Sequence, residues 1–283
     1  MRSSNPVLSR AEAFNAPAPA QYGGPQYQQF PGQAAGPQPY PGQQFPGQPY
    51  PGQQYPSDLA PAHGRMTIDD VITKSAITMG ALMVVAALTF LFLPYQLLMP
   101  ATIVSALVAF GTVMFVSFRR QVSPAFVLVY AAIEGVFIGA ISKLYESLWG
   151  GIVPTAVLGT LVAAAATLAA YKFFRIRVTS KFRKMVMIGT FAYAGVLLVN
   201  FVLSMFGMGF LFSGGNLMFL LLISAIGVGL AVFNLILDFD YIEQGVASGA
   251  PAVESWRAAF GLTVTMVWLY IEILRLLSYF RSN

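Results

Sequence analysis

The sequence contains no cysteine and a single histidine, and each shortage removes a class of chemistry. Without cysteine there can be no disulfides, no thiol nucleophiles and no thiolate metal sites. The histidine, His63, precedes the first apolar segment. A histidine-based metal site or a Ser-His-Asp triad within the apolar part of the chain is therefore excluded.

Charge is also scarce: charged residues make up 10% of the chain, and hydrophobic residues make up 57%. Soluble domains carry about 25% charged residues. With a mean hydropathy of +0.66, the sequence predicts an integral membrane protein that lies in a lipid bilayer. The net charge of +5 is then an indicator of membrane topology, and no nucleic-acid partner is expected.

Residues 1–66 differ from the rest because they repeat Pro-Gly-Gln with Tyr or Phe, as in YPGQQFPGQPYPGQQYP. Such a polar, proline-rich segment buries too little apolar surface to offset the entropy of ordering, so we predict a disordered tail. The tail is either merely solvated or adhesive, with its aromatic residues binding protein partners. No apolar stretch precedes Met66, so we expect no signal peptide.

Seven apolar segments follow in a membrane domain predicted over residues 67–283. Each is long enough to cross about 30 Å of hydrocarbon as a helix, and backbone groups in lipid must be bonded internally. Thr67 and Asp70 form a helix-start pattern before the first segment. The sequence therefore predicts an all-α protein with seven transmembrane helices, approximately at 72–93, 101–118, 124–145, 152–173, 184–206, 216–238 and 257–279.

The connections between these segments alternate between basic and uncharged. The second connection carries Arg119 and Arg120, and the fourth holds six cations between Lys172 and Lys184, whereas the first and fifth carry none. By the positive-inside rule, the N-terminus and the second, fourth and sixth connections are cytoplasmic. The fourth connection either only sets topology or also binds anionic lipid headgroups. A bacterial plasma membrane is the expected location.

A few ionisable and polar groups lie within the predicted helices, where they are costly and usually functional. Glu134 is about 15 Å into its helix and precedes the small-residue pair Gly135 and Gly139, which permits close helix approach. Each acid has an ordinary alternative role, as a hydrogen-bonded structural group or, for Glu272, as an intrahelical ion pair with Arg275. The candidates are Glu134, Glu272, Asp238, Asn200, Asn234 and Arg275, together with Asp240 and Glu243, which directly follow the sixth predicted helix.

The kinds of residue available favour ion handling over catalysis. The chain has no HExxH or GxSxG motif, so no enzymatic activity and no cofactor are expected. Carboxylates without a partner base fit cation coordination by oxygen or proton sensing. For Asn200 and Asn234, interhelical hydrogen bonding is the alternative to lining a water path.

The order of these features resembles the Bax inhibitor family of seven-helix membrane proteins. The resemblance rests on the seven-span layout, AAIEGVFIGAIS in the third span, Asp238 with Ile242 and Gly245 at the sixth, and LYIEILRLL in the last. It covers about residues 67–283 and leaves the tail outside. It implies a calcium-leak channel or transporter, with the last helix central and a protonation-sensitive pair of acids on the sixth and seventh helices.

Within the resemblance, Asp238 matches the sixth-helix acid best, with Asp240 as the alternative. Glu272 or Trp268 falls at the seventh-helix position, depending on which flanking residues are matched. Asp238 and Glu272 are then the implied ligands of a calcium ion. Glu272 lies about 22 Å along its helix from Arg257, closer in depth to Glu134.

We therefore predict that Glu134 and Glu272 share an intramembrane acidic site, with the Asp238, Asp240 and Glu243 group at the cytoplasmic mouth. The predicted function is a pH-sensitive calcium leak channel or transporter. The alternatives are a non-conducting scaffold protein that acts through its tail and a proton-coupled transporter of small solutes.

Overall fold

The computed structural model describes residues 64–119, 122–208 and 217–282. Within these residues the chain is helical with no β-strand, and seven helices are long and apolar enough to cross a membrane. The predicted all-α, seven-span fold is confirmed. The predicted disorder of the tail falls on residues 1–63, which lie outside the described residues.

The helices are α2 (Ile68–Phe92), α3 (Leu98–Phe118), α4 (Pro124–Leu148), α5 (Ile152–Phe173), α6 (Ser180–Met205), α7 (Leu217–Ala247) and α8 (Glu254–Arg281), with a short 3-10 turn, η2 (Tyr95–Leu97), before α3.

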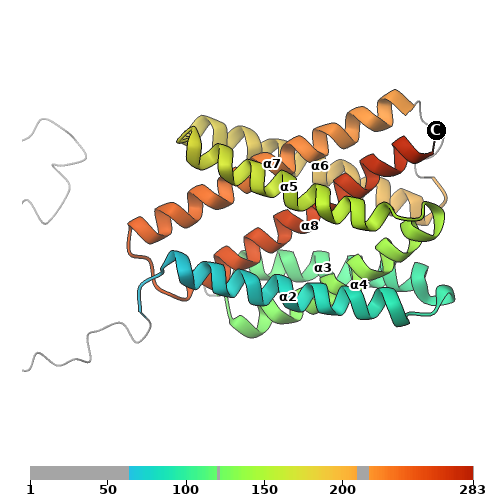
Figure 1. Ribbon diagram of the computed structural model, residues 1–283, viewed down its shortest axis with the longest axis horizontal. Coiled ribbons are helices and arrows are strands. Elements are labelled where there is room, and N and C mark those ends of the chain that lie inside the picture. The colour runs from blue at the N-terminus through green and yellow to red at the C-terminus, as the bar shows by residue number, and fades with distance from the viewer. Residues whose placement is uncertain (1–63, 120–121, 209–216, 283) are drawn as a thin grey trace, which may run out of the picture. The chain divides into compact units, whose positions relative to one another are not determined.

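The seven helices form two groups of three with α8 between them (Figure 1). One group contains α2, α3 and α4, and the other contains α5, α6 and α7. Helix α8 packs against α2, α4, α5 and α7, so it contacts both groups. The predicted central position of the last helix is therefore confirmed.

The bundle has two ends, which we name by their connections. The basic end holds the start of α2 and the α3–α4, α5–α6 and α7–α8 connections, and the opposite end holds the other three. Consecutive spans alternate in direction, so α7 and α8 are antiparallel, whereas α4 and α8 are parallel. This alternation decides which side chains share a depth.

The predicted end of the sixth span is wrong. Helix α7 continues to Ala247, nine residues beyond the predicted end, and α8 begins at Glu254. Polar side chains such as Asp240 and Glu243 do not end a helix, because its backbone bonds continue regardless of where the bilayer ends. The helix ends before Gly249, whose φ of +66° is left-handed and favours glycine.

A close contact between helices joins α2 and α4 at the two glycines that follow Glu134. A methyl group on Gly135 would lie 2.7 Å from the carbonyl oxygen of Leu82, and one on Gly139 would overlap the carbonyl oxygen of Ala86. The prediction that Gly135 and Gly139 allow close approach is therefore confirmed. The same contact turns the adjacent Glu134 into the interior of the protein, where it is 6% exposed.

The chain just before α2 is attached to the loop before α8. The amide of Met66 donates to the carbonyl oxygen of Ala250, and the amide of Ala252 donates to that of Gly64, both at 2.7 Å. The Met66 side chain is 2% exposed and packs with Val71 and Ala258. Residues 64–66, which were predicted to belong to the tail, are thus bonded to the membrane domain.

Candidate functional site

Asp238 has a buried oxygen that lacks a hydrogen-bond partner among the described residues. This oxygen is the Oδ2 atom, and the residue is partly buried on α7. The carboxyl faces α8, where a methyl group on Gly261 would lie 3.4 Å from Oδ1. Buried Thr265, one turn further along α8, is its hydrogen-bonding neighbour. A buried carboxylate with an unsatisfied oxygen is unstable in its ionised form unless the surroundings change.

Glu272, in contrast, is fully enclosed by partners. It is 1% exposed, and its Oε2 atom lies 3.1 Å from Nη1 of Arg275 in an ion pair. The Tyr193 hydroxyl donates to it at 3.0 Å from α6, and the indole nitrogen of Trp268 donates at 3.3 Å. Glu272 is therefore neutralised and hydrogen-bonded, which is the arrangement expected of a structural ion pair.

The contacts between α7 and α8 keep Asp238 and Glu272 apart. Asp238 is level with Gly261, and the Glu272 carboxyl is level with Gly227, where a methyl group would lie 2.6 Å from it. Eleven residues of α7 separate Gly227 from Asp238, which is about 16 Å along a helix. The two acids implied as calcium ligands are thus not brought together in this structure.

Glu134 lies near the depth of Asp238. Tyr130, one turn before Glu134 on α4, packs edge-on against Phe260 of α8 with ring centroids 4.9 Å apart. Since α4 and α8 are parallel, Glu134 is level with a position about one turn after Phe260, between Gly261 and Thr265. Glu272 is about two turns further along α8, so the shared Glu134–Glu272 site stays a prediction that no contact in the described residues supports.

Asp240 and Glu243 connect α7 to its neighbours at the basic end. Asp240 forms an ion pair with Arg183 of α6 at 2.8 Å and accepts a hydrogen bond from Gln244 at 2.7 Å. Glu243 accepts from the Tyr171 hydroxyl of α5 at 2.5 Å. These two acids therefore hold the ends of α5, α6 and α7 together, one turn from Asp238.

The remaining candidates are explained by local contacts. Asn234 donates to the Thr190 hydroxyl of α6 at 2.7 Å, which is the interhelical hydrogen bond expected of it as an alternative role. It also donates to the carbonyl oxygen of Leu230 in its own helix at 2.8 Å. Asn200 is buried on α6. Arg275 is the cation that compensates Glu272. The direct role of either asparagine in conduction stays a prediction.

Sequence reasoning missed Thr265, Gly261 and Tyr193. A threonine or glycine in an apolar helix carries no pattern of its own, and its importance follows from what the neighbouring helix places opposite it. Tyr193 could not be predicted for the same reason, because its hydroxyl bonds to Glu272, which is 79 positions away in the sequence. Only the alignment of one helix on another reveals these three residues.

A separate apolar cavity of about 500 Å³ lies between α2, α4, α5 and α8. Hydroxyl groups in its lining belong to Ser142, Thr160, Thr263 and Tyr270, and no carboxylate contributes to it. It therefore does not connect the acids discussed above. The described residues also contain no group of three or more metal-ligating His, Cys, Asp or Glu side chains, so a bound cation here would depend on fewer side-chain ligands.

Comparison with known proteins identifies the family of this chain. No curated protein matches the chain significantly. A family model described as Bax inhibitor 1 like matches residues 5–282. The match starts within the tail, so the prediction that the tail lies outside the resemblance is wrong. Because the match covers nearly the whole sequence, the chain belongs to the Bax inhibitor 1 like family of membrane proteins.

Proposed function

We propose that this protein is a leak channel or transporter for cations, with calcium the expected ion, and that intramembrane carboxyl groups control it. The observation that carries the proposal is the buried Oδ2 atom of Asp238 at the contact between α7 and α8, which has no hydrogen-bond partner in the part of the chain that the structure describes. A polar atom held in this way is costly in a protein that only needs to be stable. Family membership supports the same conclusion.

The arrangement of the helix groups supports a path beside α8. Asp238 belongs to the group of α5, α6 and α7, and Glu134 belongs to the group of α2, α3 and α4. Asp238 faces Gly261 of α8, and buried Glu134 lies near the same depth. A small separation of the two groups would admit water to both carboxyls, which together offer four oxygen ligands to a passing cation.

The same geometry supplies a means of control. In the packed arrangement an ionised Asp238 has an oxygen without a donor, so ionisation favours a rearrangement that hydrates it. Protonation removes that cost and favours the packed arrangement. The proposed gate therefore closes on protonation of Asp238, whereas Asp240 and Glu243 hold the basic end of α7 in place.

Glu272 takes a structural role in this proposal. Its charge is already compensated by Arg275, and both of its oxygens accept hydrogen bonds. An ion would have to displace a buried arginine to bind there, which costs far more than hydrating Asp238. The positive-inside rule supports a cytoplasmic position for the basic end.

Calcium efflux from liposomes tests the proposal. The full-length protein, reconstituted in calcium-loaded vesicles, is compared with Asp238→Asn, with Glu134→Gln and with Asp69→Asn, an exposed acid at the basic end that serves as the matched control. We expect Asp238→Asn to reduce the leak at least about tenfold and Glu134→Gln to reduce it less, whereas Asp69→Asn leaks like the wild type.

Two results would replace the proposal. If none of the proteins, including the wild type, leaks any cation, the chain acts as a non-conducting membrane scaffold. If the vesicles retain calcium but take up a small solute when a proton gradient is applied, the chain is a proton-coupled transporter. An unchanged calcium leak in Asp238→Asn would reject the role of this residue alone.

A further inference from the structure

The connection between α5 and α6 concentrates positive charge on an exposed surface. Six cations lie within thirteen residues, and all six are exposed: Lys172, Arg175, Arg177, Lys181, Arg183 and Lys184. No acidic residue occurs in the sequence between Glu146 and Asp238. Of the six, Arg183 has a recorded ion pair, with Asp240 of α7, and the other five have none among the described residues.

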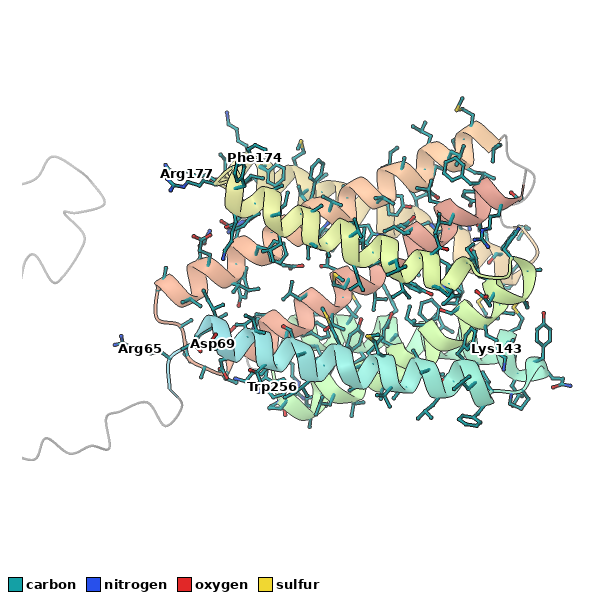
Figure 2. All side chains as sticks on the ribbon, in the orientation of Figure 1. Arg65, Asp69, Lys143, Phe174, Arg177 and Trp256 are labelled. Carbon is teal, nitrogen blue, oxygen red and sulfur yellow. The ribbon has the colours of Figure 1, made fainter. Side chains whose placement is uncertain are left out.

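Two aromatic side chains stand beside these cations. Phe173 and Phe174, at the end of α5, are 83% and 71% exposed and pack edge-on with ring centroids 5.2 Å apart. Figure 2 shows Phe174 and Arg177 together at the tip of this connection. Aromatic rings are favoured at the headgroup level of a bilayer, so an exposed Phe pair beside cations is suited to a lipid surface.

The backbone conformation at Arg175 indicates that the charge of its side chain has a role in binding. Arg175 has a φ of +47°, which is left-handed and favours glycine, and it follows α5 at the position where glycine usually ends a helix. The amide of Ile176 donates to the carbonyl oxygen of Tyr171 at 3.2 Å, which fixes this turn. An arginine is strained here, and a need for its charge explains why it stands where glycine would fit better.

We propose that residues 172–184, with the Phe173–Phe174 pair, form a docking surface for anionic lipid headgroups in the leaflet at the basic end. Five exposed cations without a local acid provide the charge complementarity, and the two rings insert between neighbouring lipids. A surface that only sets topology would need the charges but neither the strained Arg175 nor the exposed aromatic pair.

Arg183 connects this surface to α7. Its side chain is 47% exposed, and its guanidinium lies 2.8 Å from Asp240, so a lipid phosphate and the Asp240 carboxylate compete for the same group. At the other end of the surface, Tyr171 is bonded to Glu243. Anionic lipid bound here therefore weakens the Arg183–Asp240 ion pair and loosens the segment of α7 that follows Asp238.

Binding can be measured without any transport assay, so its outcome is independent of the proposed function. The chain has no cysteine, so Ser180→Cys, at the exposed start of α6, carries a single environment-sensitive dye. The labelled full-length protein in uncharged detergent is titrated with short-chain phosphatidylglycerol and, separately, with phosphatidylcholine. We expect a saturable blue shift with phosphatidylglycerol that salt reverses, and none with phosphatidylcholine or with the dye at Phe206→Cys at the opposite end.

Substitutions give the sign and size of the effect. Removing Lys172, Arg175 and Arg177 together (Lys172→Gln, Arg175→Gly, Arg177→Gln) should weaken binding roughly 100-fold, at about fivefold per cation. Arg119→Gln, which removes an exposed cation outside the surface, is the matched control and should change the affinity less than about twofold. Asp240→Asn releases Arg183 and should strengthen binding about fivefold.

If the triple variant does not fold, Arg175→Gly alone preserves the test, because glycine relieves the left-handed residue while it removes one charge. The proposal is overturned if phosphatidylglycerol and phosphatidylcholine produce equal responses, or if binding survives the loss of these cations. It is also overturned if free poly-glutamate binds more tightly than phosphatidylglycerol, since the surface would then fit an acidic protein instead.

Discussion

At Gly227, α7 has no room for even one additional carbon atom. A methyl group there would overlap the Tyr193 hydroxyl and would lie 2.6 Å from the Glu272 carboxyl. Both groups are held by other contacts, because Tyr193 bonds to Glu272 and Glu272 is paired with Arg275. The glycine is therefore a requirement of the ion pair on the neighbouring helix.

We expect Gly227→Ala to lower the free energy of unfolding by about 1–3 kcal/mol, because the buried network must move to admit the methyl group. Gly229→Ala is the matched control: it lies two residues away on the same helix, with no atom within 4 Å of the added carbon. It should be neutral or stabilise by up to about 1 kcal/mol. Thermal unfolding in detergent measures both, and equal melting temperatures would contradict this packing.

The ion pair between Glu272 and Arg275 can be tested in the same way. Arg275→Gln leaves the carboxylate of Glu272 buried without its cation and should destabilise the protein by about 3–5 kcal/mol. Adding Glu272→Gln to it removes the uncompensated charge, so the double variant should be more stable than Arg275→Gln alone. Unfolding curves of the three proteins check this order, and a double variant that is less stable than the single one would show that Arg275 acts through packing.

At the scale of elements, hydropathy predicted the existence of every span, because seven apolar runs must each cross the bilayer. It could not predict where α7 ends, since a helix that emerges into water keeps its backbone bonds past Asp238 and Asp240 to Ala247. It also could not place Met66, an apolar residue at the end of a polar tail. The side chain of Met66 is buried only because α2, α7 and α8 meet around it.

Met66→Ala should therefore destabilise the start of the bundle. The side chain is 2% exposed, and its sulfur would lie 2.9 Å from a methyl group on Gly245 of α7, so its removal leaves a cavity costing about 2–5 kcal/mol. Met99→Ala, at a position 61% exposed on α3, should change stability by less than about 0.5 kcal/mol. Amide exchange at residue 66 and at Ala252, the two amides that donate across this contact, provides the local measurement. Unchanged protection there would contradict the attachment of residues 64–66 to the loop.

For the whole molecule, the acids could be predicted from the sequence but their grouping could not. An acid in an apolar run is visible as soon as the charges are counted, so Glu134, Asp238 and Glu272 were found. Their depths depend on how α4 and α7 align with α8, which contacts such as Tyr130 against Phe260 determine. Counting residues from helix ends therefore grouped Glu134 with Glu272, whereas the contacts place Glu134 near the depth of Asp238.

The position of Asp238 predicts the direction in which the calcium leak changes with pH. In the packed bundle Asp238 is favoured when protonated, because its Oδ2 atom has no hydrogen-bond donor among the described residues. As the pH rises, more of the carboxyl ionises, the hydrated arrangement gains population and the calcium leak should increase between about pH 6 and pH 8. Lowering the pH should reverse the increase.

Asp238→Asn cannot ionise, so its leak should stay low and should not change with pH over the same range. Asp69→Asn retains Asp238 and should follow the wild-type profile. Calcium-sensitive dye in vesicles buffered at a series of pH values records all three profiles. A leak that falls as the pH rises, or an Asp238→Asn profile that still follows the wild type, would show that another carboxyl controls the gate. Glu134 of α4 would be tested next, because it lies near the depth of Asp238.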